Sequence, residues 1–252
     1  MQLFDQIIYY PLYNLLIFIY NALPFQDFGV AIVIVTILIK FALIPLSKKQ
    51  IESQKKMQEL QPKIKEVQNK YKNDKEKQSR VLMELYKENK TNPFSGCLPM
   101  VVQLIFLIAI YRVLFNISEA GLRVEEAGLY SFVSNPGQIE HMFLGMIDLS
   151  SIISFSAITL ASAPHILLVI AAAAAQYVQT KMLMAKQAPV KAGEADFAQT
   201  MTKQMLYLGP ILTLFIGFKF PAGLALYWLV STAFMIGQQY YLQKGEAQEK
   251  AK

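Results

Sequence analysis

The chain has 252 residues, of which 54% are hydrophobic and 17% are charged, and its mean hydropathy is +0.32. Soluble domains contain about 45–50% apolar and about 25% charged residues, so this composition favours a membrane protein over a soluble enzyme or a disordered chain. The single cysteine, Cys97, excludes a disulfide framework and a multi-cysteine metal site, and two histidines, His141 and His165, leave little for a metal centre. We therefore predict neither a metal nor a cofactor.

The net charge of +6 is concentrated in one part of the chain. Between Lys48 and Lys90 lie 13 of the 24 basic residues, together with seven acidic ones. This mixture is typical of a helical surface beside a membrane, and no basic groove with interleaved aromatic residues is apparent. The sequence thus predicts no nucleic acid sequence recognition.

In chain order, the first element is the hydrophobic stretch 3–24, which is interrupted by Pro11, Asn14 and Asn21. It has neither the positive n-region nor the small-residue cleavage site of a secretory signal. We therefore predict an amphipathic helix at the outer membrane interface. The alternative is a sixth membrane span, which would move the N-terminus inside.

Five later stretches approach the roughly 20 apolar residues that cross a hydrocarbon core of about 30 Å. The last two are joined by only four residues, 219–222, which predicts an antiparallel pair. The predicted fold is an all-α integral membrane protein with five transmembrane helices. Its parts are an N-terminal interfacial helix over 1–27, spans over 28–47, 95–116, 164–184, 205–219 and 220–241, a cytosolic helical hairpin over 48–94, an outer loop over 117–163, a cytosolic loop over 185–204 and a cytosolic tail over 242–252.

Lysine and arginine in the connections predict the orientation. If residues 48–96, 181–204 and 242–252 share one side, that side holds 20 of the 24 basic residues. Cytosolic connections are the basic ones, so the N-terminus is predicted outside and the C-terminus in the cytosol.

Residues 51–90 carry the pattern of a helical hairpin. Apolar residues three and four positions apart form one stripe, a turn is expected at 72–75, and a second stripe returns over 81–86. A bend is expected at Pro62, between the membrane span and the hairpin. Whether the hairpin is a solvated spacer or docks a partner stays open. The first stripe consists of Met57, Leu60, Ile64, Val67 and Tyr71.

Lys40 is the charge that stands out most, because it lies inside the first predicted span. It follows Val30 by ten residues, which places it about 15 Å below the outer end of the helix. A lysine at such a depth costs about 2.5–3.5 kcal/mol. No acidic residue lies well inside the predicted spans, so we expect the ammonium either in a water-filled cavity among the helices or snorkelling towards the cytosolic headgroups.

Other polar or amphipathic residues belong to the same predicted spans. Thr36 lies one turn before Lys40, Gln103 lies in the second span, and Tyr227 and Trp228 lie in the fifth. Each alone is typical of helix packing or of an aromatic at the membrane interface, but together with Lys40 they favour a hydrophilic groove inside the membrane. The predicted substrate-groove residues are therefore Lys40, Thr36, Gln103, Tyr227 and Trp228.

The sequence contains none of the catalytic motifs that we considered for a membrane enzyme. The sequence has no glycine-rich phosphate loop and no HExxH motif, and we expect no Ser/His/Asp set from the two histidines. The prediction is therefore that the protein is not an enzyme.

Two patterns are specific enough to suggest a family. They are NP-x-x-GCLP-x-x-x-Q at residues 92–103 and FPAGL-x-LYW at residues 220–228, and the stretches 29–50 and 60–71 match in the same order. On these residues the chain resembles the YidC/Oxa/Alb family of membrane protein insertases, in its short bacterial form without a large periplasmic domain.

The resemblance implies a five-span core around a groove that opens to the cytosol and to lipid. It implies an insertase and chaperone in the bacterial plasma (inner) membrane, which takes hydrophilic parts of nascent membrane proteins while an apolar segment enters the bilayer. The ribosome and the Sec translocon are further candidate partners. Lys40 occupies the place where the family usually has arginine, which stays protonated more firmly than lysine. The alternative is an anion channel or transporter that uses Lys40 as its binding site.

Overall fold

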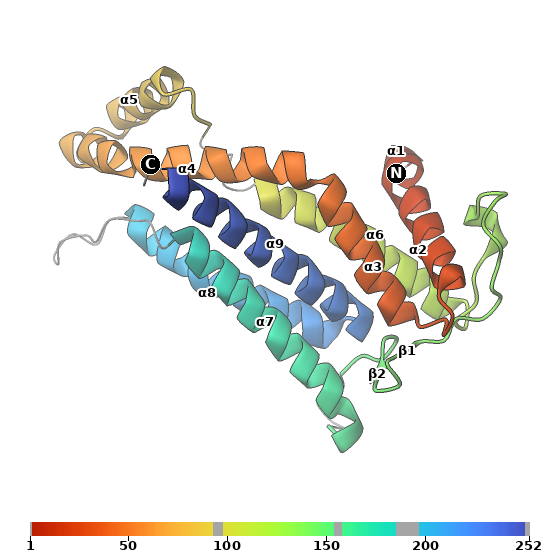
Figure 1. Cartoon of the computed structure of the whole chain (residues 1–252). Helices are drawn as coiled ribbons and strands as arrows, with labels where there is room; N and C mark the ends of the chain where they lie inside the picture. The colour runs from red at the N-terminus through yellow and green to blue at the C-terminus, as the bar shows by residue number, and fades with distance from the viewer. Residues whose placement is uncertain (1, 93–97, 154–157, 185–196, 250–252) are drawn as a thin grey trace. The chain divides into compact units, whose positions relative to one another are not determined.

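The computed structural model describes residues 2–92, 98–153, 158–184 and 197–249 (Figure 1). Residues 93–97 of the first family pattern, most of the predicted loop 185–204 and the end of the predicted tail lie outside these ranges. The described residues are mostly helical, with one small antiparallel sheet. They form two compact units. Unit 1 comprises Met1–Phe41, Ile105–Leu183 and Ala195–Lys252, and unit 2 comprises Ala42–Leu104 and Met184–Glu194.

The N-terminal segment of unit 1 is helical throughout. It consists of α1 (Gln2–Phe4), the π-helical turn η1 (Asp5–Tyr9) and α2 (Tyr10–Ala22). Asn14 does not interrupt α2, because its buried amide donates to the carbonyl oxygens of Tyr10 and Gly128, both at 2.8 Å. One face of α2 belongs to the core of the unit, with Leu16 and Ile17 fully buried. Its place at the outer membrane interface stays a prediction.

The stretch predicted as the first span is divided between two helices. Helix α3 covers Phe28–Ala42, and α4 begins at Ile44 and ends at Lys70. Pro45 lies in the first turn of α4, where a missing amide hydrogen costs no helical hydrogen bond. Pro62 lies inside α4, so the expectation of a bend between helices at Pro62 is corrected to a break at Leu43.

Unit 2 contains two packed helices, α4 and α5 (Lys75–Glu88), joined by a short turn. The turn ends at Asp74, whose carboxylate accepts a hydrogen bond from the Lys77 amide at 3.0 Å and caps α5. Gln78 of α5 donates from its side chain to the Gln68 carbonyl of α4 at 2.8 Å. Leu60 and Ile64 of the predicted stripe are buried. This stretch is the one for which the sequence predicts a hairpin.

Helix α6 (Leu98–Glu119) leads into a long connection with little regular structure. The connection contains a short 3-10 turn, η3 (Glu126–Gly128), and two short antiparallel strands, β1 (Met142–Phe143) and β2 (Ile147–Asp148). Met142 pairs with Asp148, and Phe143 pairs with Ile147. Leu144 and Gly145 at the tip of this sheet have positive φ angles, which tighten the turn.

Three long helices complete unit 1. After the 3-10 turn η4 (Leu160–Ser162) come α7 (Ala163–Met184), α8 (Phe197–Lys219) and α9 (Ala222–Glu249) (Figure 1). Gly217 lets α8 approach α7 closely, because a Cβ atom there would lie 2.6 Å from Val169. The connection between α6 and α7 also fixes the start of α9, because the Gly223 amide donates a hydrogen bond to the Leu149 carbonyl at 3.0 Å.

By length and composition, two of the described helical stretches are candidates to cross a membrane, Val101–Glu119 in α6 and Ala163–Leu183 in α7. Phe28–Ala42 and Ile44–Met57 meet the same criterion together, as a third span broken at Leu43. Leu206–Lys219 in α8 is a shorter apolar helix. The described helices fit a multi-pass membrane protein, and the number of five spans stays a prediction.

Candidate functional site

Lys40 lies in the last turn of α3. Its Nζ lies 3.3 Å from Sδ of Met235, which α9 provides. A thioether sulfur is a weak hydrogen-bond acceptor, and the flexible methionine side chain adapts to the group beside it. Lys40 therefore connects α3 to α9 from inside an apolar stretch.

Two glutamines of α7 extend this contact into a row of polar groups. The Gln179 amide donates to Met235 Sδ at 3.8 Å, and the Gln176 amide donates to Gln179 Oε1 at 3.1 Å. At the other end, Trp228 donates from its indole Nε1 to Gln176 Oε1 at 3.1 Å. We call these five residues, Lys40, Met235, Gln179, Gln176 and Trp228, the polar chain.

The polar chain satisfies groups that are costly to leave without partners among apolar helices. Gln179 and Trp228 are buried, and the polar atoms of each take part in hydrogen bonds of the polar chain. Side-chain hydrogen bonds between membrane helices typically contribute about 0.6–2 kcal/mol each. The arrangement therefore links α3, α7 and α9 by polar contacts as well as by packing.

The structure places the other predicted groove residues differently. Thr36 is buried, and its hydroxyl donates to the Ile32 carbonyl of its own helix at 2.6 Å. Tyr227 is also buried, with a hydrogen bond between its side chain and that of Ser231. Gln103 belongs to unit 2. Of the five predicted residues, Lys40 and Trp228 are members of the polar chain, and groove lining by all five stays a prediction.

Three members of the polar chain, Gln176, Gln179 and Met235, are not among the residues predicted from the sequence. A signal for the glutamines was present, since two amides three positions apart lie on one face of an otherwise apolar, alanine-rich stretch. Met235 gave no signal, because a methionine in an apolar helix is most often a packing residue.

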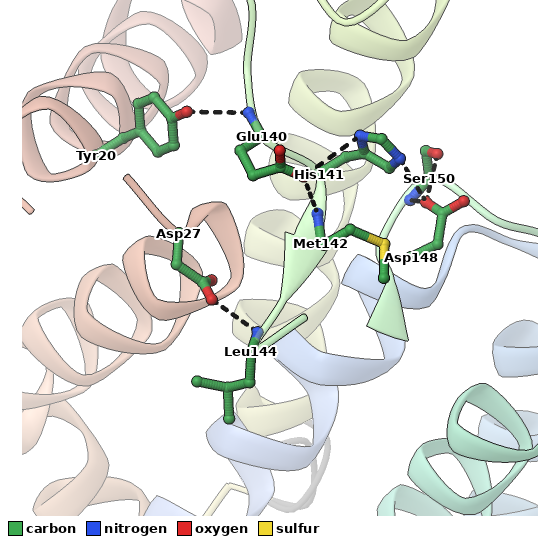
Figure 2. Close-up of polar contacts among 8 residues, drawn as sticks. All are labelled: Tyr20, Asp27, Glu140, His141, Met142, Leu144, Asp148 and Ser150. Atoms are coloured by element: carbon green, nitrogen blue, oxygen red, sulfur yellow. Dashed lines mark hydrogen bonds and ion pairs between the residues drawn. The ribbon is translucent and has the colours of Figure 1, made fainter. Parts of the chain in front are cut away.

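A second group of polar side chains lies at the small sheet. Figure 2 shows His141 between two carboxylates, with ring nitrogens 3.9 Å from Glu140 Oε1 and 3.8 Å from Asp148 Oδ1. Glu140 also accepts from the Met142 amide at 3.1 Å, and its own amide donates to the Tyr20 hydroxyl at 2.9 Å. These contacts tie the sheet to α2.

Ser151 lies close to the other histidine, with Oγ 3.4 Å from Nδ1 of His165. No Ser/His/Asp set is expected from the sequence, yet this serine and histidine lie close together. The Ser151 hydroxyl, however, donates to the Asp148 carbonyl at 2.7 Å. A nucleophilic serine must give its proton to the base, so this orientation is not that of a catalytic pair.

Comparison with known proteins places the chain in a family. It matches the family model described as 60Kd inner membrane protein over residues 18–250. It is 35% identical to the membrane protein insertase YidC of Fusobacterium nucleatum, over 86% of this chain and 87% of that protein. It is 32% identical to the membrane protein insertase YidC 2 of Bacillus anthracis, over 94% of this chain and 80% of the relative.

Other relatives are much longer than this chain. The chain covers 35% of the length of YidC from Pelobacter propionicus, to which it is 33% identical over 218 residues. A crystal structure described as an active YidC insertase with its first transmembrane domain resolved has a similar fold. The TM-score is 0.55 at 24% identity, over 94% of this chain and 46% of that chain. Since the family model spans most of the sequence, the chain belongs to the 60Kd inner membrane protein family, and its relatives include YidC membrane protein insertases.

Proposed function

We propose that this protein is a membrane protein insertase. It receives hydrophilic parts of nascent membrane proteins in a positively charged groove inside the membrane and releases their apolar segments into the bilayer. The observation that carries this proposal is Lys40, a cation on an apolar helix whose side chain enters the polar chain formed with α7 and α9. Similarity over most of the chain to proteins named membrane protein insertases supports the same assignment.

The proposed topology has five spans with the N-terminus outside and the C-terminus in the cytosol. Its basis is the excess of lysine and arginine in the connections that would face the cytosol. In this topology α4 and α5 project into the cytosol, where nascent chains emerge. We propose nascent membrane proteins and the bilayer as partners, with the ribosome and the Sec translocon as further candidates.

The energetics of the transfer explain what a polar groove would contribute. A polar group that crosses hydrocarbon without a partner costs several kcal/mol. A groove that reaches part of the way across shortens the apolar path, and the ammonium of Lys40 attracts acidic segments. The apolar segment of the substrate then partitions into lipid, which supplies about 25 cal/mol for each Å² removed from water. The reaction needs no nucleotide hydrolysis.

The test uses reconstituted vesicles and two substrates that differ only in their translocated tail, which is acidic in one and neutral in the other. Lys40→Met removes the charge and keeps an unbranched side chain, whereas Lys40→Arg keeps the charge. We expect Lys40→Met to reduce protease protection of the acidic tail at least tenfold and of the neutral tail much less. Lys40→Arg should retain insertion of both. Equal insertion of the acidic tail by Lys40→Met and by the unchanged protein would contradict the proposed role of the charge.

A further inference from the structure

A second polar site lies in unit 1, away from the polar chain. It is a cavity of about 150 Å³ between the N-terminal helices, α6 and the stretch that follows α6. Its lining brings together two cations, one anion and several neutral polar groups. The residues that matter here are Tyr9, Tyr13, Arg112, Asn116, Arg123 and Glu125.

Arg112 is held firmly at the wall of this cavity. Its guanidinium pairs with the Asp5 carboxylate and lies over the Tyr9 ring, 4.6 Å from the ring centre. A guanidinium has five N–H donors in a fixed plane, so one carboxylate does not use its whole donor capacity. Because Asp5 balances the charge of Arg112 from beside the cavity, the cavity is less positive than its two arginines suggest.

The neutral groups are arranged by hydrogen bonds around this cation. Asn116 donates to the Tyr9 hydroxyl at 2.8 Å, and Tyr13 donates to the Glu125 backbone carbonyl at 3.2 Å. Burial raises the pKa of Tyr9 above its ordinary value and that of Tyr13 to about 12, so both phenols keep their protons at neutral pH. The Tyr9 hydroxyl, which accepts from Asn116, still has its own hydrogen to donate.

The charges of the lining select the type of ligand. Arg112 and Arg123 suit a phosphate, to which arginine donates two parallel hydrogen bonds. Glu125 lies in the same lining and would repel a ligand that carries negative charge alone. A ligand with a phosphate at one end and an ammonium at the other satisfies both signs, because the Glu125 carboxylate attracts the ammonium.

The position of the cavity relates it to lipid. Arg112 lies in the candidate span Val101–Glu119, seven residues or about 10 Å from the end of that helix. Leu3 and Ile7 of the same N-terminal segment are 71% and 63% exposed, so the segment that supplies Tyr9 to the cavity also presents apolar surface that acyl chains can cover. We propose that this cavity binds the headgroup of phosphatidylethanolamine, with the phosphate at Arg112 and Arg123 and the ammonium at Glu125.

The experiment measures binding of short-chain lipids to the purified full chain in detergent by native mass spectrometry. Phosphatidylethanolamine should bind about tenfold more tightly than phosphatidylcholine, whose quaternary ammonium cannot donate hydrogen bonds, and than phosphatidylglycerol, which has no cation. Arg123→Gln should weaken binding of phosphatidylethanolamine about tenfold, and Glu125→Gln should abolish its preference over phosphatidylcholine. Arg80→Gln, which changes an exposed arginine of α5, is the matched control. It should change neither the affinity for phosphatidylethanolamine nor the preference over phosphatidylcholine.

Arg123 and Glu125 are both exposed, so their substitution should leave thermal unfolding of the lipid-free protein unchanged. Equal binding of the three lipids, or binding that neither variant alters, would overturn the proposal. Soluble O-phosphoethanolamine serves as a separate arm. If it binds as tightly as the lipid, the site recognises the free compound and the assignment to a membrane lipid is wrong.

Discussion

The Asp27 carboxylate accepts a hydrogen bond from the backbone amide of Leu144, which follows it by 117 positions, at 2.7 Å (Figure 2). The second carboxylate oxygen accepts from the Val30 amide at 2.9 Å and so caps the start of α3. Leu144 occupies a left-handed conformation at the turn between β1 and β2. One buried side chain thus fixes both the first turn of α3 and the tip of the sheet.

Asp27→Ala removes both acceptors at once. We expect a loss of about 2–4 kcal/mol in the free energy of unfolding, because a helix cap is lost and the Leu144 amide loses its charged acceptor. Asp27→Asn retains one carbonyl oxygen and should lose less. Thermal unfolding in detergent measures the stability of both Asp27 variants. Glu126→Ala, which changes an exposed acid in the connection after α6, is the control. An Asp27→Ala protein as stable as the control would show that neither hydrogen bond matters.

Gly29→Ala tests the contact between α3 and the sheet. A Cβ atom at Gly29 would lie 2.3 Å from Cδ2 and 2.6 Å from Cβ of Phe143, so rotation of the ring does not relieve the overlap. The expected loss is about 1–3 kcal/mol, and the double variant with Phe143→Gly, which removes the Cβ of residue 143 as well as the ring, should tolerate the added methyl group. Gly237→Ala in α9 meets nothing within 4 Å and should be neutral or stabilising. Equal unfolding temperatures for the two alanine variants would rule out this close approach.

Trp228 is the only tryptophan of the chain, so intrinsic fluorescence reports on its surroundings alone. Gln176→Leu removes the acceptor of the indole N–H and should shift the emission maximum to shorter wavelength, since the indole then has apolar neighbours. Gln179→Leu changes the next member of the polar chain on the same helix, without touching the indole, and should shift the emission much less. The same shift in both variants would mean that the indole does not bond to Gln176.

Leu60→Ala tests how α4 holds α5. A buried leucine contributes about 2–5 kcal/mol in a packed core, and two helices alone have little stability to lose. We expect backbone amides of residues 75–88 to exchange with deuterium faster in this variant. Glu59→Ala changes the adjacent exposed position and should leave exchange unchanged. If Leu60→Ala also leaves it unchanged, the predicted stripe is not the surface that packs against α5.

Local patterns were enough to predict several helices. Helix α7 begins and ends within one residue of the stretch predicted from its apolar composition, and the turn before α5 lies where polar residues interrupt the two apolar stripes. The break at Leu43 had a signal in Pro45, which lies in the first turn of α4, whereas the bend was predicted at Pro62. Average hydropathy hides such a break, because the end of α3 and the beginning of α4 are both apolar in sequence.

The site was harder to predict because tertiary contacts determine it. Lys40 is conspicuous as a charge in an apolar stretch, and Trp228 belongs to a specific motif. The contact of Lys40 with Met235 joins residues 195 positions apart, and no local pattern encodes it. For Asn14 the sequence suggests an interruption, yet the partner that satisfies its side chain, Gly128, lies 114 positions away.

The hydrogen bonds between α2 and the connection after α6 also determine the order in which the unit is completed during synthesis. Tyr13 bonds to a residue 112 positions later, and Tyr20 bonds to one 120 positions later. At a translation rate of about 5–20 residues per second, these partners follow roughly 6–24 s after the helix itself. During that interval Leu16 and Ile17 need other apolar surroundings. Helix α2 therefore reaches its final packing only after the connection that follows α6 has been made.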